Sequence, residues 1–190
     1  MADQPLLLAL DQGTSSSRAA VFDRDGNLVA SSSAPLPIDY PADGWVEQDP
    51  EAIWSSQLQA LVQLHRQLDD RQRAAVLSCG ITNQRETTVL WRRSSGRPCG
   101  PALVWQDGRT ADICRDWSEA GLGERWSQRT GLLLDPYFSA SKIRWMLDHL
   151  PEAADAAAGN DLCFGTVESW LLWKLTAGRR HGSDMSNASR

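Results

Sequence analysis

The chain opens with a short apolar run, residues 6–10, that ends at an aspartate. A run of this length bounded by turn residues is typical of a strand buried on both faces. A hydroxyl-rich turn containing Gly13 separates it from a second run at residues 18–22. Another tight turn at residues 23–27 then leads into residues 28–33, where apolar residues alternate with polar or small ones. These runs predict three antiparallel strands at the start of the chain.

A long helix is expected after an irregular, proline-rich loop. Residues 49–51 read Asp-Pro-Glu, which combines an N-cap, a proline at the first helical position and an acid in the first turn. Apolar residues then recur at helical spacing as far as about Asp70. Further strands are predicted at residues 74–81, 87–91, 102–105 and 162–164, and further helices at residues 110–119, 124–129, 139–149 and 167–175. This order predicts an α/β or α+β architecture.

Composition narrows the classes of function. The length of 190 residues suits one large α/β domain or slightly less than one. A net charge of -5 and scattered arginines provide no basic field for nucleic acid, which favours a small-molecule partner. The run at residues 6–10 is too short for a signal peptide or a membrane span, so a soluble cytosolic protein is expected. The cysteines and histidines lie far apart, which argues against a zinc or redox site.

The turn between the first two strands, residues 11–18, is a candidate phosphate site. A carboxylate at a strand end, here Asp11, can hold Mg²⁺ through water molecules, while Gly13 allows close backbone approach and Arg18 adds a forked cation. Amide and hydroxyl donors come from Thr14, Ser15 and Ser16. The same segment could instead be a serine hairpin that faces solvent. It is not a Walker loop, because neither lysine of the chain follows a glycine-rich turn.

Several ordered blocks of sequence carry a resemblance to a known family. The segment 11–18 resembles the amino-terminal phosphate loop of glycerol kinases, which are FGGY carbohydrate kinases of the actin-like, ribonuclease H-like superfamily. The similarity runs in register from Leu7 to the last residue. The other blocks that carry it are Gly-Trp-Val-Glu-Gln-Asp-Pro at 44–50, Gly-Ile-Thr-Asn-Gln-Arg-Glu-Thr-Thr at 80–88, Val-Trp-Gln-Asp at 104–107, Asp-Pro-Tyr-Phe-Ser at 135–139, Phe-Gly-Thr at 164–166 and Ser-Asn-Ala-Ser-Arg at 186–190.

The resemblance implies a polyol site in the middle of the chain. It places Arg85, Glu86 and Tyr137 on the hydroxyls of glycerol and packs Trp105 against the glycerol carbons. These residue types fit the task, because a carboxylate accepts from hydroxyls, a guanidinium donates to them and an aromatic face covers C–H groups. Without the resemblance, the adjacent Arg85 and Glu86 would read as a solvated ion pair at a strand end.

The resemblance also implies a nucleotide and metal site in the first turn. The residues matched to nucleotide phosphates are Thr14, Ser15, Ser16 and Arg18, and Asp11 matches the acid associated with Mg²⁺. One departure concerns the segment after Trp105, where the family frequently has a basic pair and this chain has Gly108-Arg109.

The activity implied is transfer of the γ-phosphoryl group of ATP to glycerol. The fold implied is an actin-like α/β domain with a mixed sheet and antiparallel amino-terminal strands, of which residues 1–190 would be an incomplete part. The family's catalytic base belongs to a Gly-Asp-Gln segment expected beyond Arg190, so no catalytic residue is assigned in this chain and the isolated chain is expected to be inactive. A full-length cytoplasmic form could assemble as a homo-oligomer. Two alternatives remain open: a kinase for another polyol or sugar, and a non-catalytic remnant or binding module.

Overall fold

The computed structural model describes residues 4–189. The chain divides into two compact units. Unit 1 comprises Met1–Ile38 and Glu51–Gln84, and unit 2 comprises Asp39–Pro50 and Arg85–Arg190. Each unit has its own sheet and its own hydrophobic core, so each is described by itself.

Unit 1 is built on a four-stranded sheet in the order β3-β2-β1-β5. Its strands are β1 (Leu6–Gln12), β2 (Ser16–Asp23), β3 (Leu28–Pro35) and β5 (Val76–Asn83). The first three are antiparallel neighbours, which confirms the strands predicted at the start of the chain, and β5 runs parallel to β1. Parallel pairing of β5 with β1 brings their carboxyl ends to one edge of the sheet.

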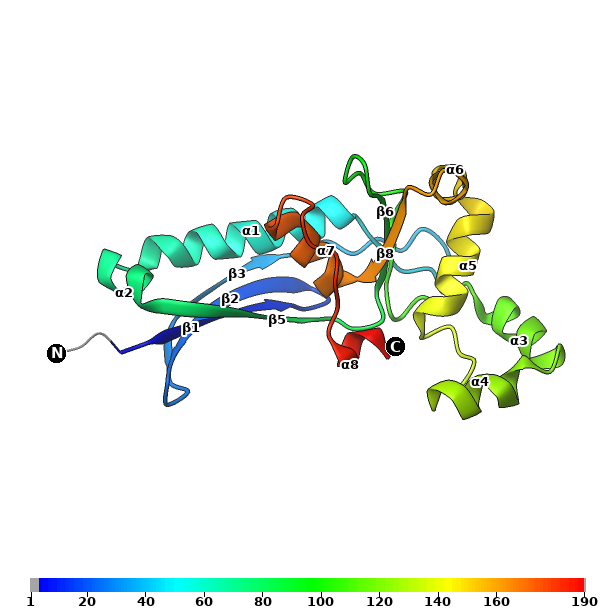
Figure 1. Cartoon of the computed structure of the whole chain (residues 1–190), viewed down its shortest axis with the longest axis horizontal. Helices are drawn as coiled ribbons and strands as arrows, with labels where there is room; N and C mark the ends of the chain where they lie inside the picture. The colour runs from blue at the N-terminus through cyan, green and yellow to red at the C-terminus, as the bar shows by residue number, and fades with distance from the viewer. Residues whose placement is uncertain (1–3, 190) are drawn as a thin grey trace. The chain divides into compact units, whose positions relative to one another are not determined.

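One long helix covers one face of this sheet. Helix α1 (Pro50–Gln67) lies along the sheet of unit 1 (Figure 1). Ala60 and Leu64 of α1 join Leu10, Ala19 and Val21 of the sheet in one buried cluster. The expected helix reaches only Gln67, and a separate short helix, α2 (Asp70–Ala75), follows it. The break arises because the Asp69 side chain accepts from the backbone N–H of Gln72, while the Gln72 side chain accepts from the backbone N–H of Asp69, which is a capping box.

Unit 2 contains a second, antiparallel sheet in the order β4-β7-β6-β8. Its strands are β4 (Glu47–Gln48), β7 (Ala102–Leu103), β6 (Thr88–Arg92) and β8 (Leu162–Thr166). Strand β6 is buried along almost its whole length. Leu90 packs in a cluster with Met146, Ala153 and Ala156, whereas the neighbouring Trp91 makes ring contacts with tryptophans of helix α7.

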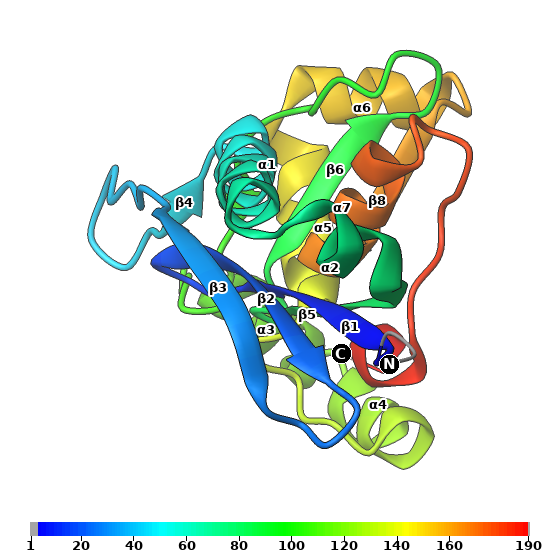
Figure 2. The ribbon, with the colours of Figure 1, turned by 90° about the vertical axis from the view of Figure 1, so that its left-hand side faces the viewer.

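Helices cover both faces of this sheet. Helices α5 (Ser139–His149) and α6 (Pro151–Ala158) lie on one side of β6 and β8, and α7 (Val167–Leu175) lies on the other (Figure 2). The remaining helices of unit 2 are α3 (Ala111–Glu119), α4 (Leu122–Thr130) and α8 (Met185–Ala188). Strand β4 and helices α2, α6 and α8 were not predicted from the sequence. Within residues 4–189, no helix combines the length and the apolar character needed to cross a bilayer.

Candidate functional site

The predicted phosphate turn borders a hollow on unit 1. Asp11, Gly13, Ser16 and Arg18 line a depression of about 520 Å³ together with the serines at 31–33. Asp11 pairs with Arg18 across β1 and β2, so their side chains emerge on the same face of the sheet. Asp11 is the penultimate residue of β1 and stands beside Thr82 near the end of β5. Ligands of α/β proteins commonly bind at such carboxyl strand ends.

A buried hydrogen-bond network supports this turn from the opposite side. Gln12 is fully buried, and its Oε1 atom accepts from the Ser17 hydroxyl at 2.8 Å. The Ser17 and Ser56 hydroxyls share a hydrogen bond of 2.6 Å, which ties the turn to α1. A Cβ atom added at Gly13 would lie 3.1 Å from the Ser16 carbonyl oxygen, so a larger residue would strain the turn. The sequence did not predict this role for Gln12 and Ser17, although their alternation with Asp11 and Arg18 places them on the core face.

The other two predicted phosphate-binding residues lie outside the lining of the hollow. Thr14 is half-buried, and Ser15 is exposed with its carbonyl oxygen accepting from the backbone N–H of Leu36 at 2.9 Å. Among residues 4–189, no three His, Cys, Asp or Glu side chains gather as a group that could hold a metal ion. Asp11 is the single carboxylate among the residues that line the hollow.

Unit 2 brings Trp105 and Tyr137 together. Their ring centroids are 6.0 Å apart and their planes meet at 72°, so the two rings make an edge contact. Tyr137 also makes an edge contact with Phe138 at 5.2 Å. The backbone N–H of Trp105 donates to the hydroxyl of Thr87 at 3.1 Å. Because Thr87 directly follows Glu86, this bond holds the Trp105 segment close to Glu86.

Glu86 occupies an unusual backbone conformation in this neighbourhood. Its residue surface is only 1% exposed and its φ is 66°, in the left-handed region that a glutamate seldom adopts. Its carbonyl oxygen accepts from the Thr88 hydroxyl at 3.1 Å and from the Ser139 hydroxyl at 3.4 Å. Such strain costs about 1–3 kcal/mol and clusters at functional sites. Arg85 is exposed whereas Glu86 is buried. A solvated ion pair would have both side chains exposed, so that alternative does not describe Glu86.

A buried lysine contacts the loop that carries Tyr137. Lys142 on α5 is fully buried, and its Nζ atom donates to the carbonyl oxygens of Pro136 and Tyr137. Burial lowers its pKa to about 8, against the opposing effect of nearby acidic groups. In the sequence, Lys142 stands out only as one of two lysines that cannot belong to a Walker loop, so its place beside Tyr137 was not predicted.

Arg109, at the departure from the family pattern, is a structural residue. Its guanidinium pairs with Asp107 at 2.7 Å and with Glu47 at 2.7 Å. The same group lies 3.8 Å from the ring centroid of Trp45 and 4.7 Å from that of Trp145. The Arg109 and Asp107 side chains are 1% and 0% exposed, which makes this a buried charge cluster held between aromatic faces.

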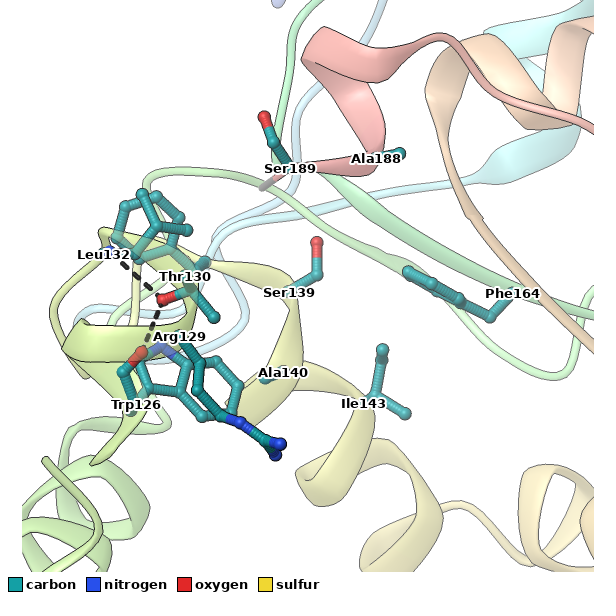
Figure 3. Close-up of a pocket in the computed structure, with 11 residues that line it drawn as sticks. Trp126, Arg129, Thr130, Leu132, Ser139, Ala140, Ile143, Phe164, Ala188 and Ser189 are labelled. Atoms are coloured by element: carbon teal, nitrogen blue, oxygen red, sulfur yellow. Dashed lines mark hydrogen bonds between the residues drawn. The ribbon is translucent and has the colours of Figure 1, made fainter.

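A second hollow, of about 480 Å³, lies beside the start of α5. Figure 3 shows Trp126 and Arg129 of α4 on one side and Ala140 and Ile143 of α5 on another, with Phe164 completing the wall. Ser139, which contacts the Glu86 carbonyl oxygen, also lines it. None of the four predicted polyol-binding residues does, so the hollow adjoins that cluster without being formed by it.

Comparison with known proteins assigns the family. Residues 6–190 match the amino-terminal domain of the FGGY family of carbohydrate kinases. The chain belongs to this FGGY family. The predicted family and the predicted α/β fold class are therefore confirmed.

Curated FGGY relatives are longer than this chain. A glycerol kinase of Ralstonia nicotianae is 54% identical over 184 residues, which cover 97% of this chain and 37% of that protein. A glycerol kinase of Methylibium petroleiphilum is 53% identical, again over 97% of this chain and 37% of the relative. The chain thus spans about two fifths of the length of these relatives.

Solved structures of kinases share the fold. A Plasmodium falciparum glycerol kinase with ADP superposes with a TM-score of 0.90 at 30% identity, covering 98% of this chain and 37% of that chain. A gluconate kinase from Lactobacillus acidophilus superposes with a TM-score of 0.84 at 18% identity, covering 98% of this chain and 36% of that chain. The second likeness concerns the fold alone.

Proposed function

We propose that this chain is the amino-terminal part of an ATP-dependent glycerol kinase. The observation that carries the proposal is the meeting of the Trp105 and Tyr137 rings beside the buried, strained Glu86, in a chain whose relatives are named glycerol kinases. Aromatic faces suit the C–H side of a polyol, and a buried carboxylate suits its hydroxyls. Unit 2 would therefore contribute the polyol-binding residues Arg85, Glu86, Trp105 and Tyr137.

Unit 1 would contribute the phosphate-binding residues of the same reaction. Arg18 and the donors Thr14, Ser15 and Ser16 would contact nucleotide phosphates, and Asp11 would hold Mg²⁺ through water. An exposed carboxylate beside hydroxyls and an arginine fits this ion, which usually takes one or two carboxylates together with phosphate oxygens. When bound, Mg²⁺ neutralises phosphate charge. The base that accepts the glycerol proton is expected outside these 190 residues. The whole enzyme would be cytoplasmic, and units 1 and 2 would form part of its amino-terminal kinase domain.

A hybrid enzyme tests the proposed substrate. Residues 1–190 would replace the aligned segment of the Ralstonia nicotianae glycerol kinase, which supplies the remaining length of the enzyme. The hybrid is expected to phosphorylate glycerol at about 1–100 s⁻¹, while the isolated chain is expected to show no turnover, because kinase sites need closure around both substrates. A coupled assay measures both. A hybrid that turns over xylulose or gluconate but not glycerol would redirect the proposal to another sugar.

Alanine substitution at Arg85 or Glu86 tests the polyol assignment in this hybrid. Each change is expected to lower kcat/KM for glycerol by a factor that corresponds to about 1–3 kcal/mol of lost transition-state stabilisation, since it leaves hydroxyls of glycerol without partners. It should also raise the glycerol KM far more than the ATP KM. Steady-state kinetics with each substrate varied in turn separates the two constants. Equal losses for both substrates would instead indicate that the pair is structural.

A further inference from the structure

We infer that Lys142 is a positioning residue for polyol binding, acting through the turn that carries Tyr137. The inference rests on the proposed function. Lys142 lies near the start of α5, and its side chain reaches back to the loop before that helix. There its Nζ atom donates to the carbonyl oxygens of Pro136 and Tyr137, the latter at 3.2 Å.

The turn has a second restraint from its own first residue. The Asp135 carboxylate accepts from the backbone N–H of Tyr137 at 2.8 Å, and the Asp135 carbonyl oxygen accepts from the N–H of Phe138 at 3.1 Å. Lys142 holds the carbonyl side of the turn while Asp135 holds its N–H side. Hydrogen bonds therefore restrain Tyr137 at both its backbone N–H and its carbonyl oxygen. Because the Lys142 ammonium supplies one of these two restraints, the direction of the Tyr137 ring toward Trp105 depends on it.

Glu86 is one of the groups that act on the charge of Lys142. Four ionisable groups influence the ammonium, and they come from four different segments of unit 2: Asp107, Cys114, Asp135 and Glu86. Asp107 is already paired with Arg109, and Cys114 carries a thiol whose pKa is raised by burial. Glu86 and Asp135 are thus the two remaining carboxylates that favour the protonated form of Lys142.

The protonation state of Lys142 predicts a pH dependence of the glycerol KM, which a lysine with a purely structural role would not produce. Burial lowers its pKa to about 8, so the side chain is charged at pH 7 and largely neutral at pH 9. A neutral amine makes weaker hydrogen bonds than an ammonium, because charge-assisted bonds are roughly twice as strong. The glycerol KM of the hybrid enzyme is therefore expected to rise about fivefold to tenfold as the pH rises through 8, with the ATP KM changing less than about twofold.

Substitution of the two lysines of the chain provides a matched pair. Lys142→Met removes the ammonium but keeps the length of the side chain, and it is expected to raise the glycerol KM at pH 7 by about tenfold and to abolish the rise above pH 8. Lys174→Met, on α7 with its Nζ 5.0 Å from the Trp170 ring, makes the same chemical change elsewhere in unit 2 and should leave both KM values unchanged.

Each outcome decides between the two proposals. A hybrid with the unaltered segment that never phosphorylates glycerol defeats the proposed function itself. An active hybrid in which Lys142→Met lowers only kcat, or raises both KM values alike, defeats the positioning role. Should Lys142→Met not fold, the unaltered enzyme still decides, because a glycerol KM that is flat from pH 7 to pH 9.5 contradicts the inference. Lys142→Arg, which stays charged over this range, should flatten the profile while keeping the KM low.

A spectroscopic measurement needs no activity. Because the chain contains only two lysines, ¹³C-lysine labelling gives two resolvable side-chain signals, assigned with Lys174→Met. The Lys142 signal is expected to titrate near pH 8. A midpoint near the ordinary lysine value of about 10.4 would leave Lys142 charged throughout this pH range and would contradict the predicted rise of the glycerol KM, and with it the inference.

Discussion

Replacing Arg109 by leucine is expected to destabilise unit 2 by about 3–5 kcal/mol. The substitution leaves the Asp107 carboxylate buried without its cation, and removing one partner of a buried pair usually costs this much. It also removes the cation held against the rings of Trp45 and Trp145. Urea unfolding followed by tryptophan fluorescence measures the loss, because Trp54 is the only tryptophan of unit 1 and the signal therefore reports mainly on unit 2.

Arg115→Leu is the matched control for this measurement. Arg115 pairs with Asp112 at 2.7 Å on the surface of α3, where the two side chains are 60% and 78% exposed. Exposed pairs of this kind contribute about 0–1 kcal/mol, so the midpoint should barely move. Similar small effects for Arg109 and Arg115 would contradict the view that Arg109 organises a buried cluster.

Replacing Asp11 by asparagine is expected to lower the kcat of the hybrid enzyme by about a hundredfold. Asparagine keeps the size and much of the hydrogen bonding of aspartate but removes the negative charge proposed to hold hydrated Mg²⁺. Losses of about 10–100-fold are already common when a residue that merely supports a metal site is changed. Measuring kcat against Mg²⁺ concentration should show that part of the loss is recovered at high Mg²⁺.

The fold of unit 1 should survive this change. Asp11 is exposed on the sheet face opposite α1, so thermal unfolding of the variant should match that of the unaltered chain. Asp25→Asn, in the exposed turn between β2 and β3, is the matched control and should alter neither kcat nor its Mg²⁺ dependence. An Asp11→Asn enzyme with unchanged kcat would favour the alternative of a serine hairpin that faces solvent.

Local patterns predicted most of the strands and long helices, but they failed where several short elements meet. The Leu6–Gln12 strand and the Ser139–His149 helix follow directly from an apolar run and from helical spacing. The capping box at Asp69 and Pro151 at the start of α6 are local signals too, but apolar spacing by itself does not separate these short helices from their neighbours. The two-residue strand β4 has no sequence signature, because its pairing with β7 is purely tertiary.

The candidate site likewise contains residues whose roles the sequence predicted and residues whose roles it did not. The residue types at Asp11, Trp105 and Tyr137 indicate their proposed tasks from the sequence, because carboxylates and aromatic rings have recognisable chemistry. The burial of Lys142 and the left-handed backbone of Glu86 could not be predicted, since their contacts are tertiary: Lys142 donates to the Tyr137 carbonyl oxygen, and the Glu86 carbonyl oxygen accepts from Ser139, far along the chain.

The backbone of Glu86 has a consequence for how this chain can evolve or be engineered. Glycine is the residue that most readily adopts a φ of 66°, so Glu86→Gly would relieve backbone strain while deleting the carboxylate. If Glu86 binds a polyol as proposed, selection for thermostability and selection for catalysis act in opposite directions at this one position. Libraries screened for stability alone would then drift toward inactive kinases, and position 86 should be held constant in any such screen.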